Sequence, residues 1–265
     1  MDPHDPYYVH PYDGHGYARA VNPRPAPGEA PRLRRLYRGE IHYWDAEFGK
    51  LLQDLRRRGL YDDMLIVVTA DHGEEFDDHG GYWHGTTLYD EAVHTPLYVK
   101  LPGNRRGGTV VRHWVQSIDL MPTLLHLLHL PVPEGVQGGD LFTGHDVVYA
   151  EESHEGNVLE SVRQRRDFKE LKLIKANPGN PRGLKPTELY DVADDPGELH
   201  DLAERQPETV REVRTTLEAQ HVLARQGATT EHDQVKLTGE AAKRLEALGY
   251  ISGSDDDAKP DAPNK

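Results

Sequence analysis

Apolar residues in the first half of the chain follow two different periods. From Pro31 to Arg58 they recur at spacings of three and four, which predicts a helix with one apolar face. A continuous apolar run at 64–70 follows, and its β-branched residues predict a buried strand of a parallel sheet. A second strand is expected at 96–100. Helix, short turn and buried strand in this order are typical of a doubly wound α/β fold.

The second half of the chain predicts a different mixture of elements. A helix is expected to begin near Ser117, where a cap residue precedes a proline suited to a first turn. The alternating residues 171–175 predict a half-exposed strand of an antiparallel sheet, with 187–191 as its partner. A further strand is expected at 147–150, and helices are expected at 207–224 and 238–248.

We expect these elements to form two folded parts and a tail. Residues 1–145 are predicted to form the back half of an α/β domain with a doubly wound sheet. Residues 146–251 are predicted to form a smaller α+β subdomain with a small antiparallel sheet and helices. Residues 252–265 are rich in Gly, Ser, Asp, Lys and Pro, and they are predicted to be disordered.

Composition narrows the classes of function. The 265 residues carry a net charge of −14, which argues against sequence-independent binding to nucleic acid or to an anionic membrane surface. The chain has no cysteine, which excludes a disulfide, a cysteine nucleophile and a Cys-ligated zinc site within these residues. Its apolar runs are too short to span a bilayer. The compartment and the oligomeric state stay open.

Asp71 and His72 stand where the apolar run at 64–70 stops. A carboxylate and an imidazole are both ligands for divalent ions, and adjacent positions at a strand end can turn into one site. The alternative is that Asp71 caps a turn and that His72 is a loop histidine.

Two further histidines, His84 and His4, could meet a substrate, and a third, His79, lies in the same loop as His84. His84 is followed by a glycine, and a histidine beside a metal can bind an anionic oxygen or protonate a leaving group. His79 is expected in a solvated polar loop. His4 lies between prolines, and so stiff a loop can hold an imidazole against a substrate, although a surface turn fits the same residues.

Several blocks of the chain, in order, resemble the sulfatases of the alkaline-phosphatase-like superfamily. Met-Asp-Pro-His-Asp-Pro-Tyr at the start resembles the Pro-His-x-Pro loop of that family, and residues 65–74 resemble its second metal-ligand strand. Residues 84–97 are similar to its [Lys/His]-Gly-Thr-x-Tyr-Glu…Pro segment, 118–124 and 188–202 to later landmarks, and 244–250 to the end of certain bacterial members. The resemblance therefore extends along nearly the whole chain.

This resemblance implies roles for particular residues. Asp71 would ligate a divalent cation, which is usually calcium in sulfatases. His72 takes the place of a neighbouring ligand that is often asparagine, and an imidazole there favours manganese or a similar ion. His84 would contact the ester group and assist the leaving oxygen. His4 would bind the sulfate or phosphate oxygens, as part of the catalytic and substrate-binding set.

One part of the family's site has no counterpart in these residues. The nucleophile of the family is a formylglycine made from the Cys or Ser of a Cys/Ser-x-Pro-x-Arg motif. The chain has no cysteine and no Ser-x-Pro-x-Arg, and the first metal-binding aspartate pair is absent too. We therefore expect this chain to be the C-terminal two thirds of a sulfatase-like enzyme, truncated at its N-terminus. As given, the chain is expected to be inactive and to bind its metal poorly.

The resemblance implies metal-dependent hydrolysis of a sulfate ester, either a small molecule or a glycan. A phosphodiesterase or phosphonate monoester hydrolase of the same superfamily is one alternative, suggested by His72. A non-catalytic fragment is the other, suggested by the missing nucleophile strand, which would leave a sheet edge exposed.

Overall fold

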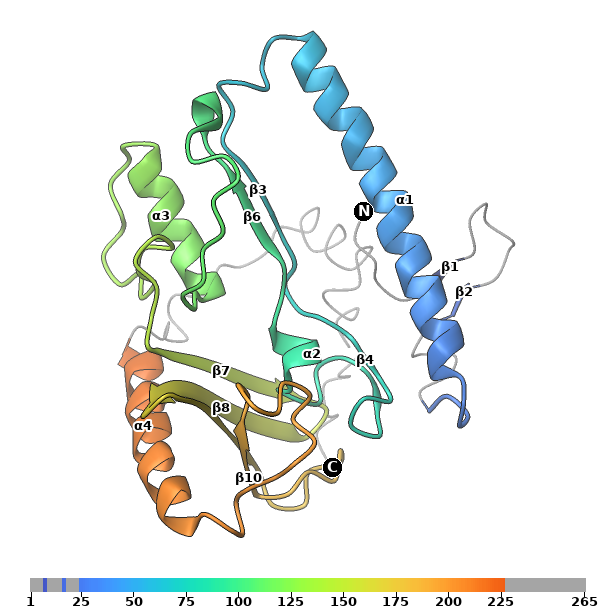
Figure 1. Ribbon diagram of the computed structural model, residues 1–265, viewed down its shortest axis with the longest axis vertical. Coiled ribbons are helices and arrows are strands. Elements are labelled where there is room, and N and C mark those ends of the chain that lie inside the picture. The colour runs from blue at the N-terminus through green and yellow to red at the C-terminus, as the bar shows by residue number, and fades with distance from the viewer. Residues whose placement is uncertain (1–6, 9–15, 18–23, 227–265) are drawn as a thin grey trace, which may run out of the picture. The chain divides into compact units, whose positions relative to one another are not determined.

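The computed structural model describes residues 7–8, 16–17 and 24–226 of the chain (Figure 1). The first two segments are the short antiparallel pair β1 (Tyr7–Tyr8) and β2 (Gly16–Tyr17). His4, the predicted helix at 238–248 and the predicted tail lie outside the described residues. The division of the chain near residue 145 stays a prediction. No helix in the described part is long and apolar enough to cross a membrane.

The long helix α1 (Ala30–Arg57) confirms the first prediction within one residue at each end. A proline stands in its first turn, and Arg56 and Arg57 stand in its last turn, where cations favour the helix dipole. Its apolar face packs at the N-terminal end, where Leu33 is buried against Phe76 and Trp83. Further along the helix, Ile41 and Leu51 are 42% and 52% exposed, so packing holds α1 mainly by its first turns.

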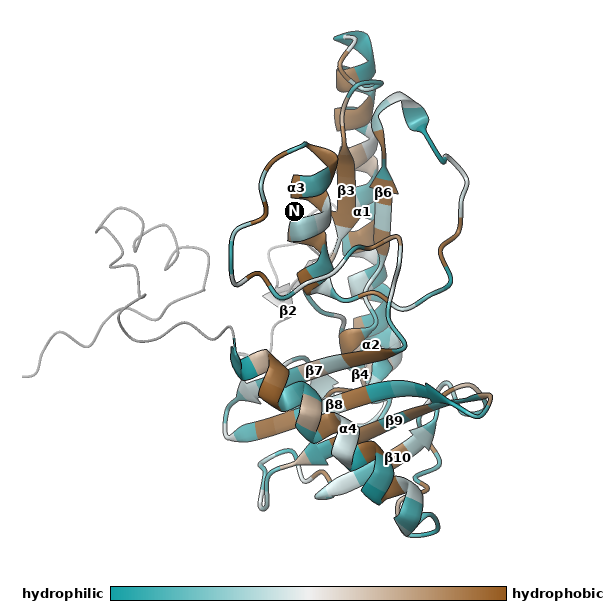
Figure 2. Ribbon diagram, turned by 90° about the vertical axis from the view of Figure 1, so that its left-hand side faces the viewer, coloured by the Kyte–Doolittle hydropathy of each residue, from teal (hydrophilic) through white to brown (hydrophobic). Residues whose placement is uncertain are grey.

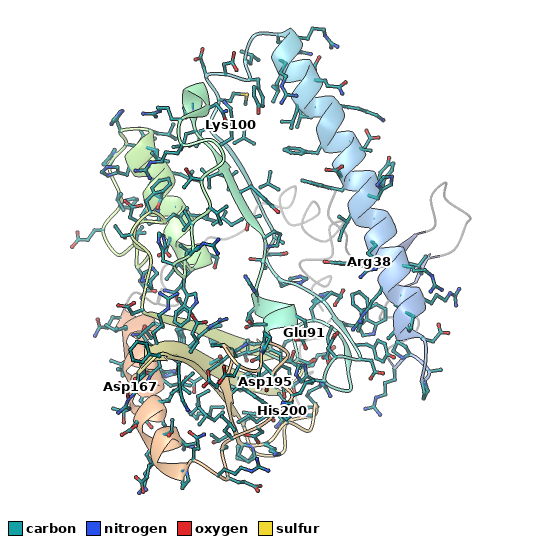
Figure 3. All side chains as sticks on the ribbon, in the orientation of Figure 1. Arg38, Glu91, Lys100, Asp167, Asp195 and His200 are labelled. Carbon is teal, nitrogen blue, oxygen red and sulfur yellow. The ribbon has the colours of Figure 1, made fainter. Side chains whose placement is uncertain are left out.

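The apolar run at 64–70 forms β3 (Ile66–Thr69), which pairs antiparallel with β6 (Leu97–Lys100). Its residues are half-buried, and Thr69 is exposed. The prediction of a buried parallel strand is therefore wrong for the described residues. The reason is the connection, because the chain between the strands contains no crossover helix and returns in the opposite direction. Lys100 lies at the end of β6 (Figure 3). Its Nζ donates to the backbone carbonyls of Tyr61, Asp62 and Met64.

The connection from β3 to β6 is built from very short elements. A hairpin of β4 (Glu75–Phe76) and β5 (Tyr82–Trp83) comes first, and one turn of helix, α2 (Asp90–Val93), comes next. After β6, the chain passes through short 3-10 turns at Pro102–Asn104 and Ser117–Asp119 into α3 (Leu120–Leu127), which confirms the helix expected near Ser117.

The C-terminal sheet is wholly antiparallel, with strand order β10-β9-β8-β7. It consists of β7 (Val147–His154), β8 (Asn157–Arg166), β9 (Lys169–Ala176) and β10 (Thr187–Asp191). The predicted pairing of 171–175 with 187–191 is confirmed, with Leu173 opposite Leu189. The sequence analysis missed β8, because its apolar residues are only Val158, Leu159 and Val162, which do not alternate, and its last residues are Arg-Gln-Arg-Arg.

The helix α4 (Pro207–Gln226) confirms the helix expected at 207–224 and lies across one face of this sheet (Figure 2). Leu173 and Leu189 from the strands pack with Val213 and Leu217 from the helix, and all four are fully buried. At about 1.5–3 kcal/mol for each buried aliphatic side chain, this cluster is the main apolar core of the described chain.

The opposite face of the same sheet is covered as well, so β9 is not half-exposed as predicted. Ile174 packs there against Tyr89, Tyr190 and Val192. Tyr89 lies just before α2, on the connection between β3 and β6. The C-terminal sheet is therefore packed on one side against its own helix and on the other against the segment that follows the histidine-rich loop.

A buried lysine joins the same two regions through charge. Lys172, in β9, has a side chain only 3% exposed, and its Nζ lies 2.8 Å from Asp90 Oδ1 and 2.8 Å from Glu198 Oε1. Asp90 begins α2, and its backbone N–H donates to Glu198 Oε2 at 2.6 Å. Burial raises the pKa of Asp90, but Lys172 and then Arg163 outweigh burial, so the net shift is downward. Lys172 thus fixes the start of α2 onto the C-terminal sheet.

The substitution Lys172→Met should lower the free energy of unfolding by roughly 3–5 kcal/mol, because it leaves Glu198 without its buried cation and Asp90 with Arg163 alone. Lys175→Met, in the same strand, is the matched control. Its side chain is 46% exposed and pairs with Glu160, so the expected change is about 1 kcal/mol or less. Urea denaturation at neutral pH measures both values. Equal losses in the two variants would contradict the role given to Lys172.

Candidate active site at the end of strand β3

The chain turns sharply after β3 at Asp71, His72 and Gly73. The Oδ1 of Asp71 accepts the backbone N–H of His72 at 3.0 Å, which orients the carboxylate although its side chain is 78% exposed. The imidazole of His72 lies 3.7 Å from the same oxygen, measured from Nε2. The two residues that the sequence proposes as metal ligands therefore face one place.

Gly73 is required by a close approach of two backbones. Its N–H donates to the carbonyl of Ala92 at 2.8 Å, and the N–H of Glu74 donates to the carbonyl of Glu91 at 2.9 Å. A Cβ at position 73 would lie 2.0 Å from the Glu91 carbonyl oxygen, far inside van der Waals contact. The residue after the two proposed ligands is thus held directly against α2.

The hairpin of β4 and β5 delivers His84 to the same place. Trp83 adopts a left-handed φ of 75°, which costs a non-glycine residue about 1–2 kcal/mol, and its buried side chain packs with Leu33 and Phe76. Gly85 follows with a φ of 78°. His84 stands between these two turns, and its ring stacks on that of His72 with centroids 4.0 Å apart.

The hydrogen bonds of the two rings select their tautomers. Nδ1 of His72 lies 2.9 Å from the carbonyl of Gly73, and Nδ1 of His84 lies 3.1 Å from Glu74 Oε1. Both partners are acceptors, so the proton of each neutral ring belongs on Nδ1 and the lone pair on Nε2. A histidine that donates one ring N–H to a carbonyl is the usual arrangement of a metal ligand. The donor set of Asp71 and His72 therefore fits a divalent cation.

The structure thus brings together Asp71, His72 and His84, three of the four residues selected from the sequence. The fourth, His4, lies outside the described residues, and its role stays a prediction. Glu74 was not selected, although it is the partner of His84. It directly follows the Asp-His-Gly motif, and its burial is the property that the sequence did not reveal.

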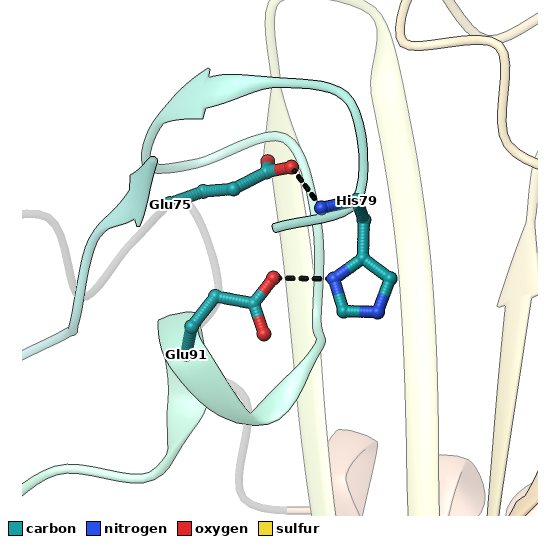
Figure 4. A group of neighbouring side chains, drawn as sticks. All are labelled: Glu75, His79 and Glu91. Carbon is teal, nitrogen blue, oxygen red and sulfur yellow. Dashed lines mark hydrogen bonds and ion pairs between the residues drawn. The ribbon is translucent and has the colours of Figure 1, made fainter. Parts of the chain in front are cut away.

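A second histidine–carboxylate group lies in the same loop, at Glu75, His79 and Glu91 (Figure 4). Nδ1 of His79 lies 2.6 Å from Glu91 Oε1, and Nε2 lies 3.2 Å from the carbonyl of Glu198. The ring stacks on Tyr89 with centroids 3.7 Å apart, and the side chain is only 10% exposed. The expectation of a solvated His79 is wrong, because the loop folds against residues more than 100 positions away.

One ligand atom from each of these three residues lies within 4.8 Å of the others, which is within the reach of a single metal ion. However, cationic side chains of the protein already neutralise the two carboxylates of this group. Nη2 of Arg182 donates to Glu75 Oε1 at 2.9 Å, and both nitrogens of His79 face acceptors, as they would in an imidazolium. Burial raises the pKa of Glu75 against the opposing charge of Arg182. We therefore assign this group a structural role.

Two family models match the chain. A model described as Sulfatase matches residues 1–130, and one described as N-sulphoglucosamine sulphohydrolase, C-terminal, matches residues 78–226, which is more than half of the sequence. The chain belongs to the sulfatase family. Both family matches include the loop that carries His79 and His84.

Individual sulfatases and their relatives agree with this assignment. Arylsulfatase K of Bos taurus is 26% identical over 215 residues, which cover 76% of this chain and 39% of that protein. The phosphonate monoester hydrolase of Agrobacterium radiobacter has 26% identity and a TM-score of 0.61, covering 87% of this chain and 48% of its own.

A protein solved with its substrate D-glucosamine-2-N,6-O-disulfate has 21% identity and a TM-score of 0.64, covering 75% of this chain and 42% of its own, and this likeness shows the fold alone. These comparisons confirm the α/β alkaline-phosphatase-like fold, in its C-terminal part. The residues that match cover 39% of Arylsulfatase K, so the match spans less than half the length of that relative.

Membership of the sulfatase family implies a divalent cation, and the donors of Asp71 and His72 fit such an ion. His94 is exposed. Its backbone N–H closes α2 by donating to the Asp90 carbonyl at 2.8 Å.

The imidazolium of His79 should make the stability of this sulfatase depend on pH. Burial lowers the pKa of His79, but the hydrogen bond and charge of Glu91, together with Glu198, outweigh burial and raise it from 6.5 to about 8. Because the folded pKa is raised, the stabilisation is fully present below about pH 6.5 and is lost as pH rises through about 8. The shift corresponds to roughly 2 kcal/mol.

The pH dependence of urea denaturation, compared between the natural chain and His79→Gln, measures this contribution. The difference between the two free energies of unfolding should shrink by roughly 2 kcal/mol from pH 6 to pH 9. The groups facing the ring are Glu91, Glu198 and Tyr89, and all three remain in the variant. A difference that is constant over this range would contradict a protonated His79.

Proposed function

We propose that this chain forms the metal-binding and leaving-group side of a sulfatase active site that hydrolyses a sulfate ester. The observation that supports this most directly is the stack of His72 on His84 beside Asp71, with the tautomers of both rings set by hydrogen bonds. Asp71 and His72 would hold the cation, and calcium is the ion that the family favours, with manganese as the alternative because of the imidazole. When bound, such a cation polarises the oxygens of the ester group.

His84 acts on the leaving group in this proposal. As an imidazolium it holds one proton on Nδ1, donated to Glu74, and one on Nε2. When the bond between sulfur and the ester oxygen breaks, the Nε2 proton passes to that oxygen, which leaves as an alcohol. The ring returns to its neutral form with its proton on Nδ1. General acid catalysis of this kind contributes about 10²–10⁴-fold in rate.

The attack on sulfur is not assigned to any residue of this chain. The 265 residues contain no cysteine and no Ser-x-Pro-x-Arg, so they offer no precursor of the family's formylglycine. We propose that the chain as given does not turn over substrate, and that the substrate of the whole protein is a small-molecule or glycan sulfate ester.

A phosphodiester or phosphonate monoester is the rival class of substrate. His72 favours it, since this residue takes the place of the asparagine common in sulfatases, and the likeness to the Agrobacterium phosphonate monoester hydrolase agrees. A non-catalytic fragment is the other rival, and the lack of a nucleophile in these residues favours it.

The metal assignment predicts that the chain binds Ca²⁺ weakly and that either Asp71→Ala or His72→Ala lowers the affinity by roughly tenfold or more. Asp63→Ala, an exposed carboxylate just before β3, is the control and should leave the affinity unchanged. Titration calorimetry with Ca²⁺, repeated with Mn²⁺, measures both variants and ranks the two ions. Binding that survives both site variants would show that the cation lies elsewhere.

The reaction is tested with the protein expressed together with whatever in-frame sequence precedes Met1 in its gene. It should hydrolyse 4-methylumbelliferyl sulfate faster than an aryl phosphodiester, and His84→Ala should lower kcat about 10²–10⁴-fold. His126→Ala, on the exposed side of α3, should have no effect. A preference for the phosphodiester would favour the first rival, and no hydrolysis of either substrate would favour the second.

A further inference from the structure

We propose that Glu74 is the positioning residue of His84: its carboxylate holds the Nδ1–H of the ring and so makes Nε2 the nitrogen that exchanges a proton with the substrate. This inference rests on the role proposed for His84, and it adds a residue that neither the sequence motif nor the family resemblance assigns. It is carried by the geometry of Glu74, of the His84 ring and of the backbone that holds both.

Glu74 is a buried carboxylate with a fixed position. Its side chain is only 3% exposed, and its Oε1 lies 3.1 Å from Nδ1 of His84. Its backbone N–H donates to the Glu91 carbonyl, next to the close contact of Gly73 with α2. Burying a carboxylate is costly unless it accepts hydrogen bonds, so the contact with His84 satisfies Glu74 as much as it orients the ring.

The described neighbours of the His84 ring set its plane but do not decide which edge of the ring faces Glu74. The stack on His72 sets the ring plane, and the left-handed turns at Trp83 and Gly85 set the direction in which the side chain leaves the backbone. A half-turn of the ring about its Cβ–Cγ bond would keep the ring plane and the stack but place the carbon Cδ2 against Glu74. The carboxylate therefore distinguishes between two orientations that the stack alone allows.

The pair formed by His79 and Glu91 is also a histidine hydrogen-bonded to a carboxylate through Nδ1, but its neighbours differ from those of His84. There the second ring nitrogen faces the Glu198 carbonyl, so protein acceptors hold both protons and the ring is a fixed cation. At His84 the carboxylate contacts Nδ1, and the ring face is stacked on a proposed metal ligand. The first pair holds the loop in place, and in the second the carboxylate orients a ring that lies against a proposed metal ligand.

The tautomer of His84 can be read directly in a chain labelled with ¹⁵N-histidine, by long-range ¹H–¹⁵N correlation at a pH where the ring is neutral. The natural chain should show His84 with its proton on Nδ1. In Glu74→Gln the side-chain amide can also donate to Nδ1, so the ratio of Nδ1–H to Nε2–H should fall by roughly tenfold or more. Glu74→Asp keeps the charge and should restore part of the ratio.

Glu91→Gln is the matched control, because it changes the carboxylate partner of the other histidine in the same loop. It should move the signals of His79 and leave those of His84 in place. The proposal is overturned if His84 in the natural chain carries its proton on Nε2, a result that needs no variant. It is equally overturned if Glu74→Gln is folded, by near-ultraviolet circular dichroism, and its ratio is unchanged.

Kinetics of the whole gene product separate this inference from the proposed function. Glu74→Gln should lower kcat about 10–100-fold with KM changed less than about threefold, and Glu74→Asp should recover part of kcat. If His84→Ala retains full activity, the role of His84 in the reaction is wrong, whatever the tautomer. If His84→Ala is inactive and Glu74→Gln is fully active, the positioning role of Glu74 is wrong and the proposed function stands.

Discussion

The contact between the backbone of Gly73–Glu74 and that of Glu91–Ala92 is the constraint on which the rest of the site depends. Two hydrogen bonds, at 2.8 and 2.9 Å, join the end of β3 to the single turn of α2. Only glycine allows this approach, because a Cβ at position 73 would meet the Glu91 carbonyl oxygen. The contact fixes the backbone next to Asp71 and His72, and it holds Glu74 where its carboxylate reaches His84. The proposed metal ligands and the partner of the proposed acid therefore lie on one fixed segment.

This backbone is itself held from the C-terminal sheet. Lys172 binds the first residue of α2, Arg182 binds Glu75, and the Glu198 carbonyl accepts from His79. Each of these contacts joins residues that are about 80 to 120 positions apart in the sequence. The loop that carries His84 has little regular structure of its own. Buried ion pairs keep it in one conformation, together with two small apolar clusters that include Trp83 and Tyr89. Such pairs add less to stability than their number suggests, but they fix position strictly.

The sequence could predict those features that depend on neighbouring residues, and it could not predict those that depend on residues far apart in the chain. The helix α1 and the pairing of β9 with β10 depend on local patterns, and the sequence predicted them. The strand end that carries Asp71 and His72 is local too, and their role as metal ligands stays a prediction. Three other features depend on contacts between distant segments. They are the direction of β3 relative to β6, the burial of the second face of β9 against Tyr89, and the burial of His79. From the sequence, a loop of histidines and carboxylates is predicted to be solvated. In the structure, Arg182 and Glu198 lie against this loop and bury His79.

Glu74 and Glu75 show why this difference matters for assigning roles. They are adjacent in extended backbone, where successive side chains point to opposite sides. Glu74 therefore reaches His84, whereas Glu75 accepts from Arg182 and from the backbone of His79. In the sequence the two residues are identical neighbours, and no local pattern separates them. Their surroundings do, since one carboxylate contacts a ring stacked on a proposed metal ligand and the other contacts a fixed cation of the C-terminal region. The same reasoning separates His84 from His79, and it places the proposed chemistry on the side of the loop that faces Asp71.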